Sequence, residues 1–177
     1  FSDLNIKMTG PSVNNASTWV YVGAVASSVA NASVENCHVL SGTCSYDVCT
    51  NGEVYTGGIC GRGGSANIKD CTNAAKVVSG RYTGIAGGIC GYARDSEFYN
   101  CHNTASVVSK CTAWGGVSVA GGVVGMAYKK DNKSNVTVST NSCSGGSAYI
   151  KAENYGNGIS WTHVEHNIIG HEMDWMR

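Results

Sequence analysis

The sequence is poor in proline, in charge and in long apolar runs. Only 1 of its 177 residues is proline, 14% are charged, and 12 basic residues balance 12 acidic ones. A chain without net charge creates no long-range field that would gather nucleic acid, so no nucleic-acid partner is expected. No stretch approaches the ~18 consecutive apolar residues of a membrane-spanning helix, so no membrane insertion is expected.

A secretion signal is also lacking at the start of the sequence. The first twenty residues have neither the basic start nor the apolar run of a signal peptide, and the chain begins at Phe1. We therefore expect an excised or mature part of a longer chain.

Small and polar turn-forming residues are abundant. The chain holds 24 Gly, 20 Ser, 16 Asn and 12 Thr, while 42% of its residues are hydrophobic, which is enough for a packed core. No stretch of eleven residues keeps the 3.6-residue apolar period of a helix, whereas residues 135–139 alternate as a half-buried strand does. These features predict an all-β fold and exclude helical repeats.

One internal repeat organises the chain. The pattern Gly-Gly-aliphatic-X-Gly starts at Gly57, Gly87 and Gly121, and a weaker copy starts at Gly23. In the copies at residues 23, 57 and 87 a cysteine follows 14 residues after the first glycine. The fourth copy reaches its cysteine late, after an insertion at residues 128–135. A period near 30–34 residues lies in the range of solenoid proteins.

The repeat predicts a short right-handed parallel β-solenoid, similar to a β-helix or β-prism, with about five coils and three short strands in each coil. A single domain is expected over residues 1–177. Its coils are predicted near residues 1–22, 23–56, 57–86, 87–120 and 121–156, with a degenerate terminal coil or cap at 157–177.

Stacking assigns structural roles to the repeated residues. The glycines are expected to permit either a positive φ or a close approach between chains, and the cysteines to be small buried hydrophobes. The residue before each cysteine is a short polar one suited to a turn, as in Asp3, Asn36, Asp70, Asn100 and Ser142. The structural repeat residues are Gly57, Gly58, Gly87, Gly88, Gly121, Gly122, Cys37, Cys71, Cys101 and Cys143.

The succession of these glycines, an apolar residue and then Asn-Cys resembles the GLUG motif repeat of bacterial surface and secreted proteins. The chain departs from that family in having Ile or Val where Leu is frequent, and in its long fourth insertion. The resemblance implies an extracellular or cell-surface location, either in large adhesin-like proteins or in non-catalytic parts of immunoglobulin A peptidases. It implies no catalytic residues.

Other candidate sites are few. Among the cysteines outside the strong columns, Cys44 and Cys49 form the favoured candidate disulfide. His163, His166 and His171 gather near one end and are weak metal candidates, but their spacing is not that of a known zinc motif, so we predict no metal. No catalytic constellation is found, and no cofactor is expected.

Aromatic residues precede the glycine pairs. Tyr21, Tyr55, Tyr82 and Trp114 occupy these positions, and two interpretations are open. Buried rings would fill a corner of the coil, which we favour, whereas exposed rings would form a sugar or protein contact surface.

The leading hypothesis is a non-enzymatic repeat module that acts as an adhesin stalk or display surface, with a host glycan or protein as its partner. One alternative is a structural subunit in which copies assemble end to end into a fibre. Another is a non-catalytic segment of a large extracellular peptidase or glycosidase.

Overall fold

A computed structural model describes residues 1–8, 19–46, 52–81, 83–111, 117–130, 133–134, 137–139, 142–143, 150–154, 161–163 and 169–174. The regular structure of these residues is entirely β, which confirms the predicted fold class. None of the described segments forms a helix long and apolar enough to cross a membrane.

Each coil runs through five short sheets, numbered here in chain order from β2. Sheet 1 contains β2 (Trp19–Gly23), β7 (Glu53–Gly57), β12 (Thr83–Gly87), β17 (Val117–Gly121) and β23 (Trp161–His163). Sheet 2 contains β3 (Ala26–Ala30), β8 (Cys60–Gly64), β13 (Cys90–Arg94), β18 (Val124–Lys130), β19 (Lys133–Ser134) and β24 (Ile169–Asp174). Sheet 3 contains β4 (Ser33–Glu35), β9 (Asn67–Lys69), β14 (Glu97–Tyr99) and β20 (Thr137–Ser139).

Two further sheets complete the coil. Sheet 4 contains β1 (Asn5–Lys7), β5 (His38–Ser41), β10 (Thr72–Asn73), β15 (His102–Asn103) and β21 (Ser142–Cys143). Sheet 5 contains β6 (Thr43–Tyr46), β11 (Lys76–Arg81), β16 (Val107–Cys111) and β22 (Ile150–Asn154). A coil therefore has five strands, and the prediction of three was wrong.

The parallel sheets stack as a β-solenoid of about three turns; the predicted number of five coils is not confirmed. Strand register follows the sequence repeat, because Gly23, Gly57, Gly87 and Gly121 are successive partners in sheet 1. Beside them, the Val25, Ile59, Ile89 and Val123 backbones are hydrogen-bonded from coil to coil. The predicted coil starts at these four glycines therefore agree with the strand register.

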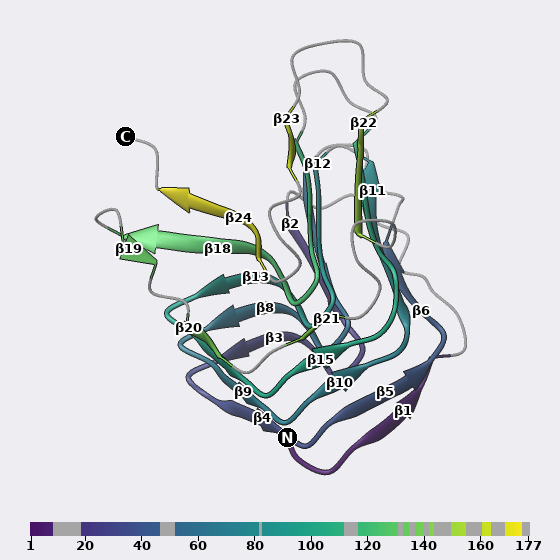
Figure 1. The fold of residues 1–177 in the computed structure, drawn as a ribbon, viewed down its shortest axis with the longest axis vertical. Coiled ribbons are helices and arrows are strands. Elements are labelled where there is room, and N and C mark those ends of the chain that lie inside the picture. The colour runs from purple at the N-terminus through teal and green to yellow at the C-terminus, as the bar shows by residue number, and fades with distance from the viewer. Residues whose placement is uncertain are drawn as a thin grey trace.

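Two separate cores lie inside each coil. Sheets 2, 3 and 4 enclose one core, to which Ile68 and Phe98 contribute, in the lower part of Figure 1. Sheets 1 and 5 lie face to face as an upright arm, and Val77, Ala86 and Val107 pack between them. Sheets 1 and 2 diverge at the repeated glycines, which form one corner of the coil, called here the glycine corner. The outer faces of these two sheets therefore face each other across a bend (Figure 1).

The coil that begins at Gly121 corrects the prediction that the first cysteine column continues to Cys143. Cys143 pairs with Asn103 in sheet 4, so it does not continue the column of Cys101. β18 and β19 form an antiparallel pair inside the insertion. The insertion lengthens the coil, so the residue in register with Cys101 is not the predicted Cys143. In the terminal coil, Trp161 is the partner of Val117, four residues before Gly121. The predicted boundary at residue 157 lies outside the described residues.

Candidate functional site

The repeated glycines are positions of close chain approach, one of the two roles predicted for them. A Cβ added to Gly57 would lie 2.7 Å from the carbonyl oxygen of Ile89, and one added to Gly88 would overlap the carbonyl oxygen of Gly122. None of the glycines at positions 57, 58, 87 and 88 has a positive φ. They are required because neighbouring coils leave no room for a side chain.

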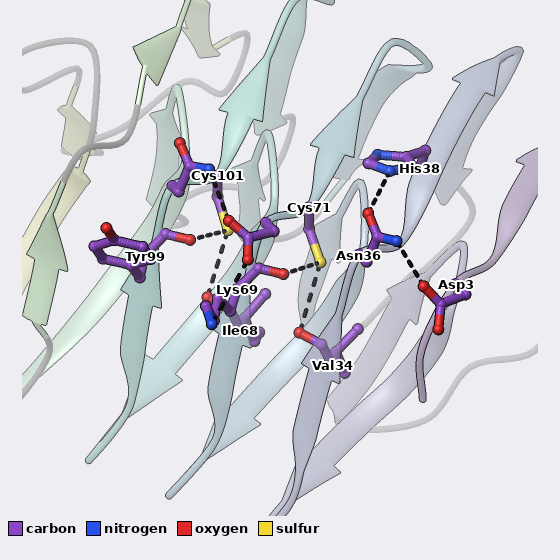
Figure 2. Close-up of polar contacts among 11 residues, drawn as sticks. Asp3, Val34, Asn36, His38, Ile68, Lys69, Cys71, Tyr99 and Cys101 are labelled. Carbon is purple, nitrogen blue, oxygen red and sulfur yellow. Dashed lines mark hydrogen bonds and ion pairs between the residues drawn. The ribbon is translucent and has the colours of Figure 1, made fainter.

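The cysteines of the first column lie in the core as predicted. Cys37, Cys71 and Cys101 are fully buried. Figure 2 shows the Cys71 thiol pointing at main-chain carbonyls, and it donates to Lys69 O (3.2 Å) and Val34 O (3.6 Å). The hydrogen bond with Cys101, followed by burial, raises the pKa of Cys71. Burial also raises the pKa of Cys37, so Cys37 and Cys71 are neutral packing groups and poor nucleophiles, whereas the hydrogen bond with Cys71 lowers the pKa of Cys101.

A second cysteine column stands in sheet 2. Cys60 and Cys90 are register partners and are both buried free thiols. The hydrogen bond with Cys90, followed by burial, raises the pKa of Cys60. Both copies of Gly-Gly-Ile-Cys-Gly contain this cysteine, so the column is visible in the sequence, but no role was predicted for it.

The candidate disulfide finds no support, and the three histidines considered as weak metal candidates lie outside the described side chains. Cys44 is a buried free thiol, so no Cys44–Cys49 bridge is formed, and Cys49 lies outside the described residues. His163 and His171 lie on strands of different sheets, sheets 1 and 2, with their side chains undescribed, and His166 is outside the described residues. Among the described side chains, no group of three or more His, Cys, Asp or Glu is placed to hold a metal ion.

Cys44 provides a test of how burial controls these thiols. Its side chain is 1% exposed, and burial raises its pKa from 9.0 to about 12. The stability that the neutral thiol contributes is complete below pH 9 and is lost as the pH rises to about 12, because the unfolded chain ionises first. Val77 and Val107 occupy the same register position in the next coils. We expect Cys44→Val to reduce the alkaline fall in unfolding free energy by about 1.4 kcal/mol per pH unit.

Urea unfolding at several pH values between 9 and 12 would measure that slope, and at pH 7 the two proteins should differ little. An unchanged slope would show that Cys44 ionises normally in the folded chain.

The polar column before the cysteines forms the predicted turns. Asp3, Asn36, Asp70 and Asn100 all have φ between 50° and 57°, the left-handed region that Asn and Asp tolerate. They are also linked between coils, since Asn36 Nδ2 donates to Asp3 Oδ1 (2.6 Å) and Asn100 Nδ2 donates to Asp70 Oδ1 (2.7 Å). Ser142 is the register partner of His102 in sheet 4, so it does not extend this column.

Two histidines extend these chains of hydrogen bonds. Figure 2 shows Asn36 between Asp3 and His38, and His38 Nε2 lies 2.9 Å from Asn36 Oδ1. One coil pair further on, His102 Nε2 lies 2.9 Å from Asn100 Oδ1. Hydrogen bonds from Asn36 and then Ser2 lower the pKa of Asp3. The arrangement recurs with the repeat and holds the turns together.

A buried asparagine ladder was missed by the sequence analysis. Asn73 and Asn103 are register partners with no exposed surface, and Asn73 Nδ2 donates to Asn103 Oδ1 (2.9 Å). Each side chain also bonds the main chain of the alanine two residues later, Ala75 or Ala105. The shared Cys-X-Asn-X-Ala sequence was the available signal.

The outer faces of sheets 1 and 2 carry a tyrosine–arginine cluster, defined by Tyr21, Tyr55, Arg62, Tyr92, Arg94 and Tyr128. Tyr21 and Tyr55 stack at 5.3 Å between ring centroids, and Tyr55 meets Tyr92 edge to face at 5.4 Å. Arg62 lies over the ring of Tyr21 at 5.6 Å, and Arg94 lies over that of Tyr128 at 5.1 Å.

The cluster combines both interpretations of the aromatic residues. Tyr55 is buried and packs with Ile85 and Val119, as a corner-filling ring does, and its hydroxyl donates to Glu53. Tyr21 and Tyr92 are half-buried and present part of their rings to solvent. Tyr82 and Trp114 lie outside the described residues.

The structure therefore defines the protein as a parallel β-solenoid whose strands keep their register from coil to coil. Comparisons with protein-family models, with curated proteins and with solved structures found no match. The resemblance to the GLUG repeat therefore stays a prediction.

Proposed function

We propose that the chain is a non-enzymatic β-solenoid module of a secreted or cell-surface bacterial protein, acting as an adhesin stalk or display surface. The observation that carries the proposal is the coil-to-coil register, which gathers tyrosines and arginines of successive coils on one outer face. Such stacking makes a rigid scaffold that holds side chains from different coils next to one another. The exported location rests on the resemblance of the repeat to the GLUG family.

A fibre subunit is the second candidate, and the first coil favours it. Phe1 is 69% exposed and Leu4 is 37% exposed, although the residues that follow them in the same columns, Val34 and Cys37, are fully buried. Strands β1, β2, β3 and β4 each lie at an edge of their sheets. An exposed core end with unpaired strand edges is able to receive another copy.

Charge at the same edge favours the display module. Asp3 and Lys7 are exposed there, and charged side chains on an edge strand discourage the addition of a further strand. We therefore expect the purified chain to remain a monomer of 18.4 kDa over a concentration series in light scattering. Growth of the molar mass with concentration, with rods one solenoid wide in negative-stain images, would replace the display module by the fibre subunit.

We also propose that this chain forms five right-handed solenoid coils. Sheets 1 and 4 each contain five strands, and parallel crossover connections are right-handed in nearly all proteins. An experimental density map in which the strands of each sheet are counted would test this number and hand.

A further inference from the structure

We propose that the tyrosine–arginine cluster is a binding site for an acidic saccharide, that is, a sugar bearing a carboxylate. This inference rests on the proposed display function and names the ligand of that surface. Its centre is Tyr92, which is the register partner of Arg62 and lies two residues before Arg94 on the same face of β13.

Two carboxylates lie at the cluster, Asp95 beside Arg94 and Glu53, which accepts a hydrogen bond from the Tyr55 hydroxyl. Arg94 pairs with Asp95 at 3.1 Å, and this pair is half-exposed to solvent. Among the described side chains, no carboxylate lies within ion-pair distance of Arg62, whose recorded contact is the ring of Tyr21. Strand register places Arg62 beside Tyr92 and Arg94 beside Gly64. The two guanidinium-bearing residues are therefore diagonal neighbours, with Cα atoms about 8 Å apart.

Space for a ligand exists beside these cations. A Cβ built on Gly64 meets no atom within 4 Å. Ser28 and Ala30, the partners of Arg62 and Gly64 in the preceding coil, are small and exposed. On sheet 1, across the bend, Trp19 is 64% exposed and lies two residues before Tyr21, on the same face of β2. The outer face of sheet 2 therefore carries small side chains in the coils near the N-terminus and larger side chains in the later coils.

These groups match the two surfaces of an acidic sugar. The C–H face of a pyranose ring packs against an aromatic ring, and Trp19, Tyr21 and Tyr92 offer such rings. A guanidinium binds a carboxylate through paired hydrogen bonds, which gives Arg62 a partner that the described residues do not supply. A neutral sugar would use the rings alone and leave Arg62 uncompensated.

Calorimetric titration of the whole chain with trigalacturonic acid, and with maltotriose as a neutral control, tests the proposal. We expect saturable binding of the acidic trimer and at least tenfold weaker binding of the neutral one. Arg62→Gln should weaken trigalacturonate binding at least tenfold. Lys76→Gln, which removes the same charge from an exposed position on β11 of sheet 5, should change it less than twofold.

A second variant protects the test against misfolding. Gly64→Leu should occupy the open space and abolish binding, while circular dichroism and the unfolding midpoint stay unchanged, because nothing lies where its Cβ would stand. Equal binding of both trimers, no binding by the parent chain, or full binding by Arg62→Gln would each overturn the proposal. A monomer that binds no acidic sugar would overturn this inference alone, whereas fibre growth in light scattering would overturn the display module.

Discussion

Replacing Gly88 by alanine should destabilise the solenoid by about 3 kcal/mol or more, one of the largest effects expected of a single methyl group. The new Cβ would overlap the carbonyl oxygen of Gly122 in the next coil and lie 2.5 Å from Cγ of Asn103. Neither neighbour moves easily, since the first is backbone and the second is fully buried and hydrogen-bonded. Urea unfolding followed by circular dichroism would measure the loss.

Gly64→Ala is the matched control, because it makes the same substitution where the added atom meets nothing within 4 Å. Its unfolding free energy should be unchanged or rise by a few tenths of a kcal/mol, since alanine reduces the freedom of the unfolded chain. If the two variants lost equal stability, close packing at the glycine corner would not be the reason for these glycines.

Replacing Asn73 by valine should lower the free energy of unfolding by about 3 kcal/mol, although the shape of valine suits this column. Asn73 donates to Ala75 O (2.8 Å) and Asn103 Oδ1 (2.9 Å), and it accepts from Ala75 N (3.0 Å). Valine would leave these fully buried groups without partners, and each unsatisfied buried group costs about 1–3 kcal/mol. Val39 occupies the same register position in the preceding coil, so valine is compatible with the backbone path.

Asn67→Val provides the comparison for this prediction. Asn67 is exposed on β9, so its substitution should change the unfolding free energy by less than about 0.5 kcal/mol. Equal unfolding midpoints in urea for Asn73→Val and Asn67→Val would mean that the buried asparagine ladder contributes nothing to stability.

The coil that begins at Gly23 supports a link between these two predictions. Ala24 follows Gly23, the sheet-1 partner of Gly57, and Val39 stands in the asparagine column of the same coil. In the next coil glycine and asparagine occur together, as Gly58 and Asn73, and a Cβ on Gly58 would meet that asparagine. The glycine at this corner therefore makes room for the amide, and the two residues form one unit of the repeat.

The features predicted correctly from the sequence are those that stacking forces to repeat. The glycine spacing gave the coil starts, and the cysteine spacing gave a buried column, because a residue inside a solenoid lies directly above its counterpart. The polar residues at 3, 36, 70 and 100 were correctly assigned to turns, since Asn and Asp adopt the left-handed conformation found there.

Other features of the fold could not be predicted from the sequence repeat. Five strands in a coil are not evident from periodicity, because β10 and β15 are only two residues long and show no alternation. The insertion after β18 changes the spacing to Cys143, so the sequence repeat did not predict that Cys143 pairs with Asn103. The tyrosine–arginine cluster also escaped prediction, because its members come from different sheets that meet only in three dimensions.

The first cysteine column places one buried thiol in each of three successive coils, at positions 37, 71 and 101. A thiol reagent reaches such a group only when its own coil opens, so the labelling rates of the three report local opening along the axis. Uniform rates would describe a solenoid that opens as one cooperative unit. A gradient from Cys37 to Cys101 would describe fraying from the first coil, and its steepness would measure how strongly neighbouring coils are coupled.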